Sequence, residues 1–244
     1  MNRSVVARMS DHDRQAAVGL EKGSSPGNCN TAYKENVVFK PWGYEFLLGQ
    51  SSCVAAWCLR INEGHQTSMH CHPRKDTVLL VLDGNGEVAT LVERYEVSSG
   101  SVIFLESGVF HQTSAYSDRL LLCEFESPVD KYDLLRLQDA YGRKDKGYEK
   151  IVTERDQEFV GSHPRTPFVD FDAVSDSGVT LSFSALGIPA KLSLTWVNVG
   201  SEKADQFNHH RLSLDHAVSI ERSIFANHEF EMKSKFLIWE YCVD

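Results

Sequence analysis

The chain has 244 residues, a formal net charge of -9 and 24% charged residues. These values argue against a nucleic-acid-binding protein, because phosphate contacts need a basic face. No apolar run approaches the roughly 18 residues of a membrane span, and the six cysteines include no Cys-x-x-Cys pair. We therefore expect free thiols in a reducing compartment, and a cytoplasmic protein that binds neither nucleic acid nor membrane.

The N-terminal stretch is polar, rich in Ser, Gly and Asn, and without sustained periodicity. This composition predicts a flexible N-terminal arm over residues 1–32, in which a short helix around Asp11 to Leu20 can form. From Val37 onward, short apolar or alternating segments are separated by Gly, Asn, Ser and Asp. Strands and turns at this spacing are typical of an antiparallel sandwich or barrel, so we expect an all-β domain over residues 33–150.

Two further segments follow the predicted barrel strands. In residues 130–142, Tyr132, Leu135 and Leu137 stand among charged residues at near-helical spacing, which predicts a short helix after the barrel. Residues 151–244 carry alternating runs again and predict a β-rich C-terminal region. This region is either a degenerate copy of the first barrel or a set of extra strands packed on it.

Two histidines, His70 and His72, are separated by one residue in front of an apolar run. On a strand both side chains project from the same face, which makes a natural chelating pair. Alone, such a pair is more often an ordinary strand with two imidazoles, because short motifs have high false-positive rates. A second element changes this balance. The stretch from Gly100 passes through an apolar strand, turns at residues 106–108 and brings His111 onto the following strand.

Together these stretches resemble the two motifs of the cupin superfamily. The matched residues are Gly64, His70, His72 and Gly84 in the first motif, and Gly100, Gly108 and His111 in the second. The resemblance covers residues 36–128 and implies an RmlC-like double-stranded β-helix, or jelly roll, whose motif residues line the barrel interior. It also implies a divalent metal ion (Zn²⁺, Mn²⁺, Fe²⁺ or Ni²⁺), because imidazole suits all four. Its predicted ligands include His70, His72 and His111.

One position departs from the first motif. The motif's metal-binding glutamate falls at Thr77, whereas the neighbouring residue Asp76 is a carboxylate. A one-residue shift along a strand reverses the face of the sheet, so Asp76 is a metal ligand only if a local bulge re-aims it. Otherwise the metal site has lost its carboxylate. In the second motif, Glu106 replaces a proline.

Two flanking segments are similar to those of mannose-6-phosphate isomerase type cupins, including the C-terminal cupin domains fused behind mannose-1-phosphate guanylyltransferases. The segments are VFKPWGYEFLL at residues 38–48 and DLLRLQDAYGR at residues 133–143. The resemblance implies a role in carbohydrate metabolism. We expect a sugar-phosphate isomerase- or epimerase-like activity in nucleotide-sugar or surface-polysaccharide supply.

Such an isomerisation needs an electrophile on the sugar oxygens and a base of near-neutral pKa. The metal would be the electrophile. The candidate bases are Asp76, Glu106 and His65. The candidate substrate-binding residues are Arg74, Lys75 and Trp42. The two cations could hold a phosphate or form a solvated turn, and the indole could stack on a sugar or anchor the barrel mouth.

Two alternatives remain open. The missing carboxylate at Thr77 is compatible with a carbohydrate-binding or sensing protein that has no catalytic activity. Three histidines that hold Fe²⁺ with an open coordination position would suit a cupin dioxygenase. For the favoured function we expect a sugar or sugar phosphate as the small-molecule partner. We also expect a homodimer, since two-fold assemblies are the commonest oligomers.

Overall fold

The structure is a computed structural model that describes residues 4–20, 37–51 and 54–142 in full. Beyond residue 142 it describes the backbone of five strands. The chain divides into two units. The first contains Met1–His163 and Pro167–Val169, and the second contains Pro164–Thr166 and Asp170–Asp244. Each unit is described by itself.

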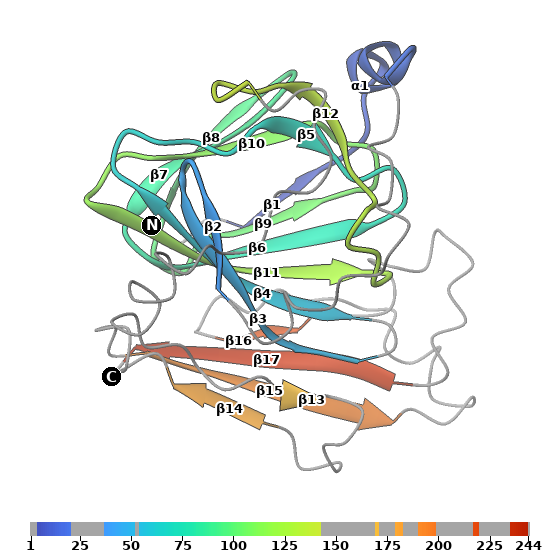
Figure 1. Cartoon of the computed structure of the whole chain (residues 1–244). Coiled ribbons are helices and arrows are strands. Elements are labelled where there is room, and N and C mark those ends of the chain that lie inside the picture. Colours follow the sequence, from blue (N-terminus) through green and yellow to red (C-terminus); the bar gives the residue numbers. More distant parts are fainter. Residues whose placement is uncertain are drawn as a thin grey trace. The chain divides into compact units, whose positions relative to one another are not determined.

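The larger sheet of the first unit carries most of its long strands (Figure 1). All of its neighbouring strands described here are antiparallel, except β1 and β9, which are parallel. The hydrogen-bonded order is β1 (Ser4–Ala7), β9 (Val102–Leu105), β6 (Asp76–Asp83), β11 (Arg119–Ser127), β4 (Ala55–Asn62) and β3 (Gly43–Gln50), with β2 (Val38–Lys40) also paired to β3.

The smaller sheet of the first unit faces the larger one and closes the barrel (Figure 1). Its order is β12 (Leu135–Gln138), β5 (Met69–Cys71), β10 (His111–Ala115), β7 (Asn85–Thr90) and β8 (Arg94–Ser98). All of these neighbouring strands are antiparallel. Two facing antiparallel sheets of this kind form a jelly roll, so the predicted all-β fold is confirmed.

Side chains from both sheets meet in an apolar core between them. On the larger sheet, every second residue points inward, as Leu59, Leu79 and Leu122 do. Val88 and Tyr95 join them from the smaller sheet. A clean alternation of buried and exposed residues is seen in β8 of the smaller sheet, whereas β3, β6 and β9 of the larger sheet are buried on both faces. Removing this apolar surface from water stabilises the barrel by roughly 25 cal/mol per Å².

The prediction of a flexible arm is wrong for residues 4–20. β1 pairs with β9, and α1 (Asp11–Ala17), the short helix expected there, begins with a capping box. Asp13 is only 2% exposed, and its Oδ1 accepts a hydrogen bond from the main-chain N–H of Phe110 at 3.0 Å. The polar composition concealed these elements, because their partners lie far away in the sequence.

The predicted helix over residues 130–142 is also wrong. This segment contains β12, in which Leu135 lies opposite Cys71 of β5. The near-helical pattern was ambiguous, because Leu135 and Leu137 are also two residues apart, which is the period of a strand. The edge of β5 offers main-chain hydrogen-bond partners, so residues 135–138 form a strand rather than part of a helix. The segment therefore lies beside the histidine-bearing strand.

The described part of the second unit is one antiparallel sheet. Its order is β14 (Val179–Ser182), β15 (Ala190–Asn198), β17 (Lys235–Val243) and β16 (Ala217–Ser219). The short strand β13 (Val169–Asp170) lies where the two units divide. The β-rich character of this region is confirmed, whereas its origin as a degenerate cupin stays a prediction.

Two expectations from composition can be compared with the described residues. Cys58, Cys71 and Cys123 are buried free thiols, as expected. No helix in the described ranges combines the length and the apolar character needed to cross a membrane.

Candidate metal centre

Three histidines of the smaller sheet meet beside a pocket in the barrel. His70 lies on β5, His72 follows the end of that strand, and His111 begins β10 directly opposite His70. The ring centroids of His70 and His111 are 4.5 Å apart, and those of His70 and His72 are 5.2 Å apart. One ring nitrogen from each residue lies within 4.8 Å of the others. The structure therefore brings together the three histidines that the sequence predicts.

Each imidazole is oriented by a main-chain carbonyl. The Nδ1 atoms of His70, His72 and His111 lie 2.8, 2.6 and 3.0 Å from the carbonyl oxygens of Ser68, Asp133 and Val109. A carbonyl oxygen only accepts hydrogen bonds, so each Nδ1 must be protonated and donate. The lone pair of each imidazole is therefore on Nε2, as in most metal-binding histidines.

Burial keeps the three imidazoles neutral. It lowers the pKa of His70 and His72 well below the usual value. It also lowers the pKa of His111 to about 4. Neighbouring imidazoles contribute to the shifts of the first two, and the Lys75 ammonium lowers the pKa of His72 further. Three neutral, oriented imidazoles form a donor set that fits a divalent transition-metal ion.

Asp76, predicted as a metal ligand or base, is not brought to this cluster. Its Oδ1 accepts a hydrogen bond from the main-chain N–H of Ser107 at 2.8 Å. On β6 the inward residues Leu79 and Val81 belong to the core, so the alternation of the strand puts Thr77 on the inner face and Asp76 on the outer face. No bulge reverses this register between β6 and β9. The prediction that Asp76 binds the metal is therefore wrong.

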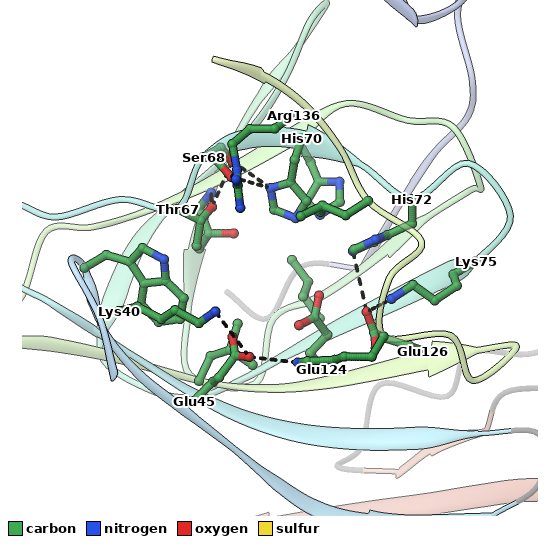
Figure 2. Close-up of a pocket in the computed structure, with 17 residues that line it drawn as sticks. Lys40, Glu45, Thr67, Ser68, His70, His72, Lys75, Glu124, Glu126 and Arg136 are labelled. Atoms are coloured by element: carbon green, nitrogen blue, oxygen red, sulfur yellow. Dashed lines mark hydrogen bonds and ion pairs between the residues drawn. The ribbon is translucent and has the colours of Figure 1, made fainter. Parts of the chain in front are cut away.

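Two carboxylates that the sequence analysis missed lie near the histidines instead. Glu124 and Glu126 are on β11, and their carboxylate oxygens form a group with His72 in which all donor atoms lie within 4.8 Å. Glu126 Oε1 is 3.5 Å from His72 Nε2 and forms an ion pair with Lys75 (Figure 2). The sequence did indicate these positions, because residues 124 and 126 continue the series of every second, inward-facing residue along an apolar strand.

The pocket in front of the histidines is lined by charged side chains (Figure 2). Its cationic residues are Lys40, Lys75, Lys131 and Arg136, and its carboxylates are Glu45, Glu124 and Glu126. Burial, and next the charge of Glu126, raise the pKa of Glu124 to about 8. Burial lowers the pKa of Lys131, although the nearby Glu45 carboxylate opposes this shift.

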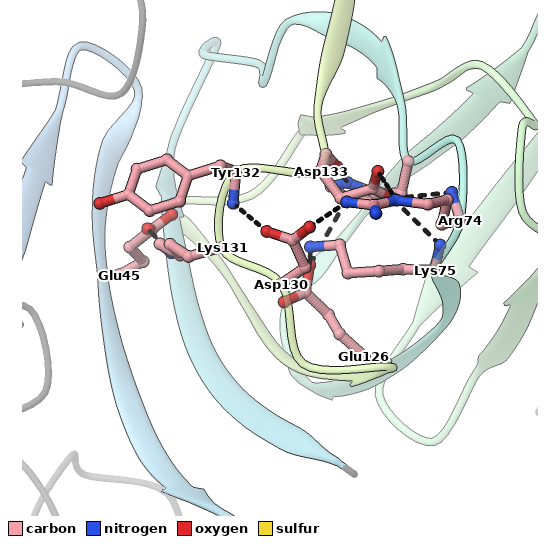
Figure 3. A network of polar contacts seen from close by, with 9 residues as sticks. Glu45, Arg74, Lys75, Glu126, Asp130, Lys131, Tyr132 and Asp133 are labelled. Atoms are coloured by element: carbon pink, nitrogen blue, oxygen red, sulfur yellow. Dashed lines mark hydrogen bonds and ion pairs between the residues drawn. The ribbon is translucent and has the colours of Figure 1, made fainter. Parts of the chain in front are cut away.

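Of the three predicted substrate-binding residues, two line the pocket and one does not. Trp42 and Lys75 line the pocket and are buried. Arg74 is not among the lining residues, and its guanidinium pairs with Asp130 and Asp133 (Figure 3). Arg74 therefore stabilises the fold through these two ion pairs and does not line the pocket.

The other two candidate bases also lie outside the pocket lining. Glu106 Oε2 accepts a hydrogen bond from the main-chain N–H of Met9 at 2.8 Å. The ring of His65 is stacked on that of Tyr141, with centroids 6.4 Å apart, and its Nδ1 contacts the Glu63 carbonyl. Their predicted role as catalytic bases has no support from this geometry.

Comparison with protein families agrees with the fold and the histidine cluster. Residues 57–123, from β4 into β11, match the family model described as a cupin domain. This match, the jelly roll and the placement of the motif histidines support the predicted cupin superfamily for this part of the chain. The closer likeness to mannose-6-phosphate isomerases stays a prediction.

Parts of several solved structures are similar to the chain. KdgF from Halomonas sp. is 20% identical, with 39% of this chain and 89% of that chain covered and a TM-score of 0.37. An RmlC-like cupin from Shewanella frigidimarina NCIMB 400 is 20% identical, with 39% and 86% covered and a TM-score of 0.37. The capsular polysaccharide assembling protein CapF from Staphylococcus aureus is 16% identical, with 43% and 34% covered and a TM-score of 0.38. No curated protein matches the chain.

Proposed function

We propose that this protein is a divalent-metal-dependent cupin enzyme of carbohydrate metabolism that isomerises or epimerises a sugar phosphate. One observation carries the proposal: the three oriented histidines and a set of buried acidic and basic side chains line the same pocket. Such a pocket can hold a polar, anionic molecule next to groups that transfer protons.

His70, His72 and His111 would hold the metal. In each ring Nδ1 contacts a main-chain carbonyl, so Nε2 carries the lone pair that would bind the ion. Bound there, the ion would act as a Lewis acid on the sugar's carbonyl and hydroxyl oxygens. The remaining roles belong to side chains of the pocket.

Glu124 is our candidate for proton transfer. It lies on the inner face of β11, lines the pocket, and has a carboxylate oxygen within 4.8 Å of the His72 donor atom. When an aldose becomes a ketose, a proton leaves C2 and one is added at C1, while the hydroxyl proton moves from O2 to O1. Glu124 would accept the first proton and return it at C1.

The phosphate would bind to the cationic residues of the pocket. Lys40 and Lys131 approach Glu45, with Nζ to Oε1 distances of 3.7 and 2.8 Å, and Arg136 Nε is 3.2 Å from Ser68 Oγ. These contacts preorganise three cations around the pocket, so that they lose little freedom when an anion binds.

Deuterium exchange tests the proposed reaction directly. The protein is loaded in turn with Zn²⁺, Mn²⁺, Fe²⁺ and Ni²⁺ and incubated in D₂O with a panel of aldose and ketose phosphates. We expect NMR to show deuterium at C2 or C1 of one substrate. The Glu124→Gln variant should lose about 100-fold or more of the rate, the usual contribution of a catalytic acid or base. Glu96→Gln, on the exposed side of β8, is the matched control and should keep the rate.

Two outcomes would overturn the proposal in favour of the alternatives. Sugar binding without exchange under any metal would indicate a carbohydrate-binding or sensing protein. Oxygen consumption by the Fe²⁺-loaded protein would indicate a dioxygenase.

The wider setting stays a prediction. We place the activity in nucleotide-sugar or surface-polysaccharide supply, in the cytoplasm and in a homodimer. The buried free thiols of Cys58, Cys71 and Cys123 support a reducing compartment.

A further inference from the structure

Strand β11 carries a carboxylate opposite the position where β6 has Thr77. In the antiparallel pair of β6 and β11, Glu126 is the direct partner of Thr77. We propose that Glu126 is a metal ligand that acts together with the three histidines. The inference deepens the proposed function and rests on its metal-binding part.

The spacing of donor atoms supports this role. Two ligands of a tetrahedral ion with bonds of about 2.1 Å lie about 3.4 Å apart. The distance between His72 Nε2 and Glu126 Oε1 is 3.5 Å. His72 is also the member that the two donor groups share, one with His70 and His111 and one with Glu124 and Glu126. Glu126 thus approaches the histidine cluster from its His72 side.

The inner face of β6 offers no carboxylate at this place. Thr77 is 1% exposed, and its Oγ1 has no hydrogen-bond partner in the part of the chain that the structure describes. Directly paired residues of two antiparallel strands have Cβ atoms about 4.5–5.5 Å apart on the same face. A carboxylate from position 126 therefore reaches the space that one from position 77 would reach.

Lys75 holds the Glu126 carboxylate in place. Its side chain is 2% exposed, and its ammonium forms an ion pair with the same Oε1 that approaches His72 (Figure 2). This ion pair keeps the carboxylate oxygen beside His72 Nε2, where a shared metal ion would lie. The same ammonium repels a bound cation, so it should weaken metal binding.

The test is a Co²⁺ titration of the metal-stripped full chain, with affinity from chelator competition and coordination from the visible absorption of the bound ion. We expect Glu126→Gln to lower the affinity at least about tenfold, since loss of even an indirect partner costs 10- to 100-fold, and to change the spectrum. Glu96→Gln, on the exposed side of β8, is the matched control and should change the affinity by less than about threefold.

A carboxylate swap sharpens the test. In the double variant Thr77→Glu with Glu126→Gln, the carboxylate moves across the strand pair, and we expect most of the affinity and the Co²⁺ spectrum to return. An unchanged affinity and spectrum in Glu126→Gln would overturn the proposal and leave the carboxylate only its Lys75 ion pair. If the swap variant does not recover affinity and Glu96→Gln loses as much affinity as Glu126→Gln, the proposal is also overturned.

The buried ion pair needs its own control. Glu126→Gln alone removes the carboxylate that pairs with the buried Lys75 ammonium, which can impair folding. Comparing Lys75→Met with the double variant Lys75→Met and Glu126→Gln avoids this. The tenfold loss should persist between these two variants, and equal affinities would again overturn the proposal. A sugar panel without turnover would leave these metal titrations unaffected, so the two proposals fail separately.

Discussion

At the scale of single residues, Asp133 organises the histidine cluster without reaching its pocket. The residue is fully buried, and its main-chain carbonyl orients His72. Its carboxylate accepts hydrogen bonds from the main-chain N–H groups of Arg74 and Lys75 at 2.7 and 3.1 Å, and from Arg74 Nε (Figure 3). The loop after His72 is thus held by one aspartate of the segment before β12.

We predict that Asp133→Ala destabilises the protein by about 1–3 kcal/mol, the cost of leaving buried donors unsatisfied. It should also lower Co²⁺ affinity, because the loop that carries His72 loosens. Denaturant unfolding and Co²⁺ titration measure the two effects. Asp130→Ala is the control, since Asp130 pairs with the exposed guanidinium of Arg74. Equal effects of the two substitutions would contradict this account.

At the scale of elements, two glycines of the first motif perform different tasks. Gly84 joins β6 to β7 with φ of +86°, and a Cβ there would lie 2.1 Å from the Arg119 carbonyl oxygen. Gly64 has φ of +70°, but a Cβ there would meet nothing within 4 Å. Gly84 therefore permits both a left-handed turn and a close approach of β11, whereas Gly64 permits only the turn.

This difference predicts unequal effects of alanine. Gly64→Ala should cost roughly 1–2 kcal/mol, the usual penalty of a left-handed residue. Gly84→Ala should cost clearly more, because the main chain of β6 or β11 must also shift. Thermal unfolding of the two variants gives the comparison. If Gly64→Ala proves as damaging as Gly84→Ala, the contact with Arg119 is not the cause.

At the scale of the whole molecule, metal binding should stabilise the fold, because an ion that binds only the folded chain shifts the equilibrium toward it. At a free metal concentration of 100 times the Kd, the gain is about 2.7 kcal/mol. We expect Zn²⁺ or Co²⁺ to raise the Tm of the wild-type protein by several degrees and EDTA to reverse the rise. His72→Ala should abolish the response. His65→Ala, outside the pocket lining, should retain it, and loss of the response in both variants would refute the ligand assignment.

Much of the first unit was predictable from local patterns. The two-residue spacing of His70 and His72 places both side chains on one face, and the structure confirms this together with the position of His111. Alternating apolar residues predicted the strands, because the period of a strand is set by its backbone alone. Counting from Gly84 placed the glutamate position of the motif at Thr77, but the prediction of Asp76 as a metal ligand was wrong, because Asp76 lies on the outer face of β6.

The remaining features were decided by pairing between distant segments. The N-terminal strand β1 is stabilised by pairing with β9. Residues 135–138 form the strand β12 because they pair with the edge of β5. The carboxylate near His72 comes from Glu126, whose relation to Thr77 exists only through the register of β6 and β11. Local periodicity by itself indicated the all-β fold class and put His70 and His72 on one face, whereas the addition of His111 was implied by the resemblance to the two cupin motifs. Only the tertiary structure decided which acid accompanies the histidines, because strand register joins residues that no local pattern connects.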